Sequence, residues 1–329
     1  MYKRGGHKTE RGIEMINKIA IIGSGVMGSG IAQSFASSGY AVTINDIEEE
    51  LLILAEKRIS ENLSLLIEEE VLTDQEKQGA LANISYSVDL EAALRDADFI
   101  IEAIPEVIEL KLSLYEQMEK IIKPDAIVAS NTSTFPISQL MAKASFADRM
   151  VITHFFNPGH LVPLVEIVQH DETRLEIVET TLALMRKIGK SPILLKKEIA
   201  GFIANRLQTA LMREAFHLLK EGVADAEDID TAITAGPGFR WAFTGPIEIA
   251  DLGGLDTWQR VFDNVSPLLD QSKEAPVLIR DLVEEGKFGA KSGEGIFTYE
   301  GSAASRKISE RDRHFVKLAK LKREKEEIV

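Results

Sequence analysis

The sequence predicts an α/β protein in which a doubly wound sheet is followed by an all-helical C-terminal domain. Three observations lead to this fold class. Short apolar runs alternate with helix-like segments over residues 18–130, and a glycine-rich turn follows the first run. From about residue 171 the pattern becomes mostly helical. At 329 residues the chain is long enough for two domains, each with its own core.

The first strand and the turn after it have the residue pattern that binds a dinucleotide. Residues 18–22 are apolar and largely β-branched, as in a buried parallel strand. Gly23 allows a tight turn, Gly25 lets the backbone approach a pyrophosphate, and Gly28 lets the next helix pack closely. That helix, residues 26–38, directs free N–H groups at the phosphates. The predicted Rossmann-type turn therefore binds the cofactor through Gly23, Gly25, Val26, Met27 and Gly28.

The second strand indicates which dinucleotide is bound. Residues 41–45 are followed by Asp46, 18 residues after Gly28. A carboxylate at this point accepts hydrogen bonds from the adenosine ribose and repels a 2′-phosphate. The alternative is that Asp46 only caps the helix that begins near Glu48. We expect NAD as the cofactor, in preference to NADP.

The remaining elements follow in order along the chain. Further strands are expected at 84–87, 98–103, 126–130, 150–155, 161–168 and 191–195, and helices at 48–70, 74–82, 106–122, 137–143, 200–221, 225–235, 246–265 and 275–285. The predicted organisation is a disordered lead-in at 1–15, a dinucleotide-binding domain at 16–197, a helical substrate and dimerisation domain at 198–300, and a charged, helical tail at 301–329.

Composition excludes several classes of protein. No apolar run approaches the roughly 20 residues that a membrane span needs, so we expect no membrane partner. A net charge of −14 argues against nucleic acid as a partner. The absence of cysteine excludes disulfides, thiol catalysis and thiolate metal sites, and fits a reducing cytoplasm. We expect a cytoplasmic protein without a metal that acts on a small molecule.

One histidine and one glutamate form a candidate catalytic pair. His154 ends the apolar strand 150–155, and Glu166 is the single charged residue of the strand 161–168. A carboxylate in an apolar strand is costly to bury without a partner. The turn at 157–159 folds the second strand back and brings Glu166 to His154. Glu166 then fixes the tautomer of the ring and leaves its other nitrogen as a base. The alternative is a buried pair without chemistry.

Further polar residues lie where ligands of this fold bind. Ser133 follows the fifth strand at the carboxyl edge of the sheet, where its hydroxyl holds a substrate oxygen or caps a helix. Asn205 lies near the start of the second domain, where its amide reaches the cleft or bonds across the junction. Glu106 and Lys111 lie on the helix after the fourth strand, on the cofactor side, or are ordinary surface residues.

Taken together, four motifs resemble those of the L-3-hydroxyacyl-CoA dehydrogenases over roughly residues 16–300. They are Ser130-Asn-Thr-Ser133, His154-Phe-Phe-Asn157-Pro158 with Glu166, Gly201-Phe-Ile-Ala-Asn205-Arg206, and Lys287-Phe-Gly-Ala-Lys-Ser-Gly-Glu-Gly295. The resemblance implies a helical domain that forms a homodimer and a catalytic pair of His154 and Glu166. It also implies that Ser133 and Asn205 position the substrate, with Asn157 beside them, and that Asp46, Glu106 and Lys111 line the NAD site.

Two segments depart from this pattern. On the long helix after Asp46, the family holds the CoA adenosine and its 3′-phosphate with a hydroxyl and a lysine, where this chain has Asn62 and Glu69. The segment 236–246, which includes Arg240, is instead similar to L-gulonate 3-dehydrogenases (lambda-crystallin-like proteins) and carnitine dehydrogenases. An arginine facing the cleft clamps a free carboxylate through two hydrogen bonds.

The expected activity is the reversible, NAD-dependent oxidation of a short L-3-hydroxyacyl-CoA to the 3-ketoacyl-CoA, a reaction of fatty acid metabolism. His154 takes the hydroxyl proton as the hydride leaves for the nicotinamide. The first alternative is a dehydrogenase of a free 3-hydroxy acid, of the gulonate or carnitine type, whose carboxylate Arg240 holds. The second alternative is a crystallin-like protein that binds NAD without turnover.

Overall fold

The computed structural model describes residues 16–142 and 144–328, so the predicted lead-in at 1–15 lies outside the described residues. The chain forms two compact units. The first extends to Ile203 and also takes in Asp312–Ala319, and the second comprises Ala204–Arg311 and the residues from Lys320 onward. This division falls six residues beyond the predicted one at 197/198, because the turn 201–203 packs with the first unit.

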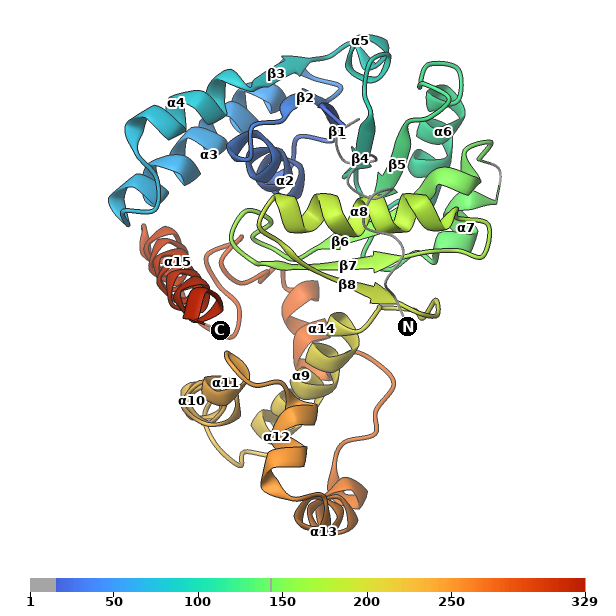
Figure 1. Cartoon of the computed structure of the whole chain (residues 1–329). Helices are drawn as coiled ribbons and strands as arrows, with labels where there is room; N and C mark the ends of the chain where they lie inside the picture. Colours follow the sequence, from blue (N-terminus) through green and yellow to red (C-terminus); the bar gives the residue numbers. More distant parts are fainter. Residues whose placement is uncertain (1–15, 143, 329) are drawn as a thin grey trace. The chain divides into compact units, whose positions relative to one another are not determined.

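The first unit is built on a doubly wound sheet of eight strands (Figure 1). Its order is β3-β2-β1-β4-β5-β6-β7-β8, and the chain reverses its direction of winding between β1 and β4. Neighbouring strands are parallel except β6 and β7, which are antiparallel. The strands are β1 (Lys18–Ile22), β2 (Ala41–Asn45), β3 (Ile84–Ser87), β4 (Phe99–Glu102), β5 (Ile127–Ser130), β6 (Met150–Phe155), β7 (Leu164–Val168) and β8 (Ser191–Leu195).

Two apolar clusters pack on the two faces of this sheet, because successive strand residues point to opposite sides. In β1, Ile19 and Ile21 join one cluster, whereas Ala20 and Ile22 join the other. The first cluster includes α2 (Val26–Ser37), α3 (Glu49–Glu68), α4 (Asp74–Ala82) and α8 (Leu175–Lys187). The second includes α5 (Leu90–Leu94), α6 (Ile108–Met118) and α7 (Ile137–Met141). Both faces are thus covered, as a mainly parallel sheet requires.

The second unit is helical. Its helices are α9 (Ala204–Lys220), α10 (Ala226–Ala235), α11 (Pro237–Trp241), α12 (Pro246–Gly253), α13 (Leu255–Val265) and α14 (Val277–Glu284). The single helix predicted at 246–265 is wrong, because Gly254 has a φ of +90° and separates α12 from α13. The helix predicted from residue 200 begins instead at Ala204.

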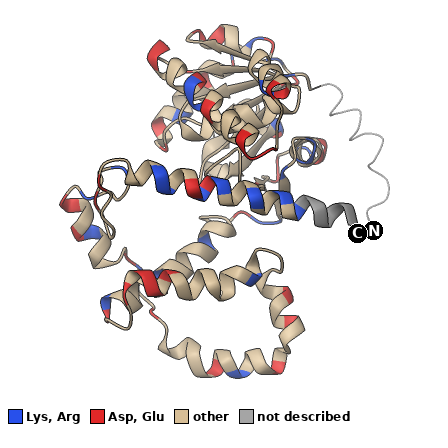
Figure 2. Ribbon diagram, turned by 90° about the vertical axis from the view of Figure 1, so that its left-hand side faces the viewer, with Lys and Arg blue, Asp and Glu red and all other residues tan. Residues whose placement is uncertain are grey.

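The charged segment after residue 300 forms α15 (Ala303–Ile328), and basic residues recur along it (Figure 2). Its middle part, Asp312–Ala319, belongs to the first unit, where Val316 is buried. Among the described residues, no helix combines the length and apolar character that crossing a membrane requires.

Candidate active site

The glycine turn between β1 and α2 has the shape that a pyrophosphate needs. Gly23 has a φ of +101°, and a Cβ there would lie 2.6 Å from the carbonyl oxygen of Ala103. A Cβ on Gly28 would lie 1.8 Å from the carbonyl oxygen of Gly23, so only glycine allows α2 to approach the turn. Gly25 has no atom within 4 Å of its would-be Cβ. Its open side, next to the exposed Val26 at the start of α2, leaves room for phosphate oxygens.

Asp46 lies beside this turn at the end of β2. Its Oδ2 accepts hydrogen bonds from the backbone N–H and the hydroxyl of Ser24, at 2.7 and 2.6 Å. Its Oδ1 accepts from the N–H of Ile47 at 2.8 Å. These bonds join the carboxylate to the glycine turn, as the predicted role at the adenosine ribose requires. Sequence reasoning missed Arg58 of α3, which donates to the hydroxyl of Ser29 in α2 at 2.9 Å.

His154 and Glu166 face each other in the antiparallel pair of β6 and β7. Nδ1 of His154 lies 2.8 Å from Oε2 of Glu166, and the two side chains are 4% and 0% exposed. Since an ionised carboxylate only accepts hydrogen bonds, Nδ1 carries the proton and Nε2 keeps a lone pair. The other carboxylate oxygen, Oε1, accepts the backbone N–H of Ile203 at 2.9 Å. The pair thus presents an oriented imidazole base.

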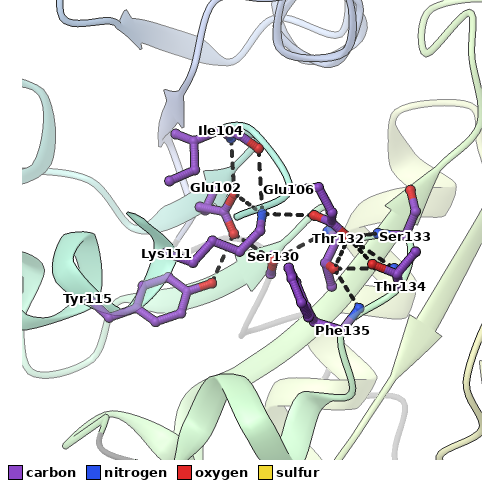
Figure 3. A network of polar contacts seen from close by, with 10 residues as sticks. All are labelled: Glu102, Ile104, Glu106, Lys111, Tyr115, Ser130, Thr132, Ser133, Thr134 and Phe135. Atoms are coloured by element: carbon purple, nitrogen blue, oxygen red, sulfur yellow. Dashed lines mark hydrogen bonds and ion pairs between the residues drawn. The ribbon is translucent and has the colours of Figure 1, made fainter. Parts of the chain in front are cut away.

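A single carboxylate organises the loop that carries Ser133 (Figure 3). Oε1 of Glu106 accepts hydrogen bonds from the hydroxyls of Thr132 and Thr134, at 2.5 and 2.8 Å. It also accepts the backbone N–H groups of Ser133 and Thr134, at 2.9 and 3.0 Å. The loop lies at the same sheet edge as His154, because β5 and β6 are parallel and Oδ1 of Asn131 accepts the N–H of Phe155 at 2.9 Å.

A buried network is joined to Glu106 through Lys111 (Figure 3). The ammonium group of Lys111 lies 2.6 Å from Oε1 of Glu102 and 3.2 Å from Oε2 of Glu106. Oε2 of Glu102 accepts the hydroxyls of Tyr115 and Ser130, at 2.9 and 2.6 Å. Lys111 is 1% exposed, and its ammonium group is paired with both carboxylates.

Burial and charge set the protonation states in this network. Partial burial raises the pKa of Glu106, but the hydrogen bond from Thr132 and the charge of Lys111 outweigh it, so the pKa lies below its ordinary value. Burial, together with the charge of Glu102, raises the pKa of Tyr115 well above its ordinary value. Glu106 is therefore an anion and Tyr115 a neutral hydrogen-bond donor at pH 7.

The other predicted site residues are placed as follows. Asn157 is exposed and directly follows Phe156, whose ring centroid lies 4.7 Å from that of His154. Asn205 belongs to α9 of the second unit, where its Oδ1 accepts a hydrogen bond from Gln208 at 3.0 Å. Arg240 is exposed on α11 of the same unit. Within the first unit, His154, Glu166 and the Ser133 loop are gathered at one sheet edge.

Sequence reasoning also missed Glu102, Thr132 and Tyr115. A signal for Glu102 was present, because it ends the apolar run Phe99-Ile-Ile-Glu102 just as Glu166 interrupts its own apolar strand. A charge in such a run needs a buried partner. Lys111 and Tyr115 lie on the next helix and supply it.

A doubly wound sheet, a glycine turn with an acidic residue after the second strand, and a buried His–Glu pair together define a dinucleotide-dependent dehydrogenase. The comparisons with known proteins give the family. The model for the 3-hydroxyacyl-CoA dehydrogenase NAD binding domain matches residues 18–199, and the model for the C-terminal domain of the same enzymes matches residues 201–299. The chain therefore belongs to the 3-hydroxyacyl-CoA dehydrogenase family of NAD-dependent oxidoreductases acting on CH–OH groups.

Individual relatives differ in the substrates that their names give. A 5-formyl-3-hydroxy-2-methylpyridine 4-carboxylate 5-dehydrogenase of Mesorhizobium japonicum is 34% identical over 93% of this chain and 98% of its own length. A probable 3-hydroxybutyryl-CoA dehydrogenase of Deinococcus radiodurans is 35% identical over 86% of this chain and its own full length. An L-carnitine dehydrogenase of Streptomyces coelicolor is 34% identical over 93% of this chain and 94% of its own length. A solved structure of the pyridine carboxylate dehydrogenase covers 93% of this chain with a TM-score of 0.87.

Proposed function

We propose that this chain oxidises a hydroxyl group on a small substrate that carries a free carboxylate. His154 takes the hydroxyl proton through Nε2 as the carbonyl forms, and Glu166 stabilises the imidazolium. NAD, when bound, accepts the hydride. The hydroxyl of Ser133, and Asn157 and Asn205, hold the substrate oxygens. Asp46 and Glu106 line the cofactor site, together with the glycine turn.

The observation that carries the choice of substrate is the environment of Glu69. This residue occupies the position at which the family resemblance implies a lysine for the CoA 3′-phosphate. Its Oε1 lies 2.7 Å from Nη1 of Arg313 in α15, and its side chain is 13% exposed. Arg313 also reaches Glu68, at 2.5 Å, and Lys317 lies 4.0 Å from Glu69. The end of α3 thus offers an acid that is paired with α15, where the family resemblance implies a lysine that binds the phosphate directly.

The second position that binds CoA in the family also forms a hydrogen bond within this chain. Asn62, where the resemblance implies a hydroxyl for the CoA adenosine, donates from Nδ2 to Oε1 of Gln33 at 3.0 Å.

A short L-3-hydroxyacyl-CoA is the second candidate substrate. The resemblance favours it through Ser133 and the segment 287–295, which follow the acyl-CoA pattern. If this candidate is the substrate, the nucleotide end of CoA binds away from Glu69. The reaction then belongs to fatty acid metabolism. The buried His154–Glu166 pair argues against a crystallin-like protein without turnover, because such a protein needs no oriented base.

The deciding experiment compares kcat/KM with NAD for 3-hydroxybutyryl-CoA and for free 3-hydroxybutyrate, L-gulonate, L-carnitine and hydroxylated pyridine carboxylates. We expect at least one free acid to exceed the thioester by about tenfold or more. Replacing Arg240 with alanine should then raise KM for that acid by about 10–100-fold, as expected for loss of hydrogen bonds to a charged group. The control is Arg260→Ala, which removes another exposed arginine of the second unit. Turnover of the thioester alone would overturn the proposal.

We also propose that the chain forms a homodimer through its helical unit. No residue of the described helices α9 to α14 is fully buried. Large apolar side chains are exposed on these helices, including Phe239 at 72%, Ile247 at 84% and Leu252 at 76%. Exposed apolar surface of this extent is typical of an interface. Sedimentation equilibrium should give twice the chain mass, and a monomer at micromolar concentration would contradict this proposal.

A further inference from the structure

The turn that ends the first unit has an unusual backbone. Gly201 and Phe202 have φ angles of +74° and +51°, just before α9 begins at Ala204. The left-handed conformation is ordinary for glycine but costs about 1–2 kcal/mol for a residue with a Cβ. Phe202 adopts it although its side chain is bulky. Such a conformation persists only when the surrounding structure determines it.

Packing of the ring holds Phe202 in this conformation. The side chain is 1% exposed and belongs to the apolar cluster on the α6 and α7 face of the sheet. Burial of a phenyl ring contributes about 2–3 kcal/mol, which exceeds the cost of the left-handed backbone. The ring therefore anchors a backbone geometry that the residue would not adopt in an open loop.

Two contacts join this turn to the proposed base. The ring centroid of Phe202 lies 5.3 Å from that of His154, with the planes inclined by 56°. The next residue, Ile203, donates its backbone N–H to Oε1 of Glu166 at 2.9 Å, while Oε2 faces His154 at 2.8 Å. The peptide that carries this N–H follows Phe202 directly, so its direction depends on the backbone angles of Phe202.

We propose that Phe202 is a positioning residue for the His154–Glu166 pair. Its left-handed backbone aims the N–H of Ile203 at Glu166 and so fixes the plane of the carboxylate. Its ring closes one side of the imidazole. Both effects maintain the hydrogen bond from Nδ1–H of His154 to Glu166 and keep Nε2 directed toward the substrate. This inference rests on the proposed role of His154 as the base, but it can be tested separately from turnover.

A matched pair of substitutions separates the backbone from the side chain. Leucine and isoleucine contain the same atoms, but a β-branched residue is far less tolerant of a positive φ. Phe202→Leu should keep the turn, whereas Phe202→Ile should displace it. The control is Phe146→Ile, because Phe146 is a buried member of the same apolar cluster with a φ of −100°.

The primary measurement is the Nδ1–H proton of His154, observed by NMR with ¹⁵N-labelled histidine and assigned by its absence in His154→Gln. This proton should exchange slowly in the wild type, in Phe202→Leu and in Phe146→Ile. It should exchange with water at least tenfold faster in Phe202→Ile. In the same variant kcat should fall by about 10²-fold, as expected for a misplaced catalytic group, while the Kd for NADH stays within about twofold.

The outcomes are distinguishable. Faster exchange of the His154 Nδ1–H proton in Phe202→Ile, but not in Phe202→Leu or Phe146→Ile, supports the proposal. This holds even if no tested substrate turns over and the proposed function fails. Equal proton exchange and equal kcat in Phe202→Leu and Phe202→Ile would overturn it. Equal losses in Phe202→Ile and Phe146→Ile would overturn it as well, because they would indicate general loosening of the core.

Discussion

Oε2 of Glu166 lies 2.8 Å from Nδ1 of His154, and the two residues occupy directly opposed positions on β6 and β7. Opposed positions of an antiparallel pair bring side chains close without help from any loop. The second carboxylate oxygen is held independently, by the N–H of Ile203. The sheet therefore brings His154 and Glu166 together, and the turn that carries Ile203 holds the far side of the carboxylate.

Replacing His154 with glutamine should lower kcat by about 10²–10⁴-fold, because loss of a general base removes this range of acceleration. The Kd for NADH should stay within about twofold, since the glycine turn is separate from the pair. Initial rates and a fluorescence titration of NADH measure the two effects. Loss of NADH binding together with activity would mean that His154 is a structural residue.

Replacing Asp46 with alanine should reduce the preference for NAD over NADP by about tenfold or more, because a carboxylate no longer repels the 2′-phosphate. The ratio of kcat/KM values for the two cofactors measures this. Asp96→Ala is the control, because Asp96 is an exposed acid of the same unit, paired with Lys18. Equal use of both cofactors by the wild type would mean that Asp46 does not contact the adenosine ribose.

Replacing Glu106 with glutamine should destabilise the protein by about 1–2 kcal/mol at pH 7, because Oε1 accepts four hydrogen bonds and a charged acceptor strengthens them. The folded-state pKa of Glu106 lies below its ordinary value of 4.5. Its ionisation therefore stabilises the fold above pH 4.5, and this contribution is lost as the pH falls further.

The difference in Tm between wild type and Glu106→Gln should consequently shrink as the pH is lowered below about 4.5. Thermal unfolding from pH 7 to pH 3.5 measures this. Glu116→Gln, an exposed change on α6, the helix that follows Glu106 in the chain, should show little difference at any pH. A Tm difference independent of pH would contradict the charged state assigned to Glu106.

The single variant Glu69→Lys should lower KM for 3-hydroxybutyryl-CoA by about tenfold at low salt, because it replaces an acid with a cation that can bind a phosphate. KM for a free acid should not change. Salt should weaken the effect. If wild type already binds the thioester tightly and Glu69→Lys does not improve on it, the nucleotide end of CoA binds elsewhere.

The sequence predicted the parts of the site that depend on local pattern. The glycine turn and Asp46 follow from spacing along one βα unit, and the meeting of His154 and Glu166 follows from one hairpin. The sheet with its helical second unit follows from the alternation of apolar runs. These features depend on short-range geometry, which residue order determines.

Features that depend on long-range packing were not predictable in the same way. The support that Lys111 gives Glu106 joins two strands and a helix, and only the fold shows that its ammonium group is buried. The left-handed backbone of Phe202 contradicts the preference of its own residue type, so no local rule predicts it. The pairing of Glu69 with Arg313 spans 244 residues. The break at Gly254 was missed because a glycine within a helical pattern is often tolerated.

The way in which Glu106 holds its loop has a consequence for engineering. At position 133 the loop is anchored through a main-chain N–H and not through the side chain. The side chain at this position can therefore be exchanged while the loop keeps its shape. Libraries at Ser133 should give folded proteins with altered substrate preference, whereas changes at Thr132, whose hydroxyl is itself an anchor, should cost stability. Position 133 is thus open to substitution, whereas Thr132 next to it maintains the shape of the loop.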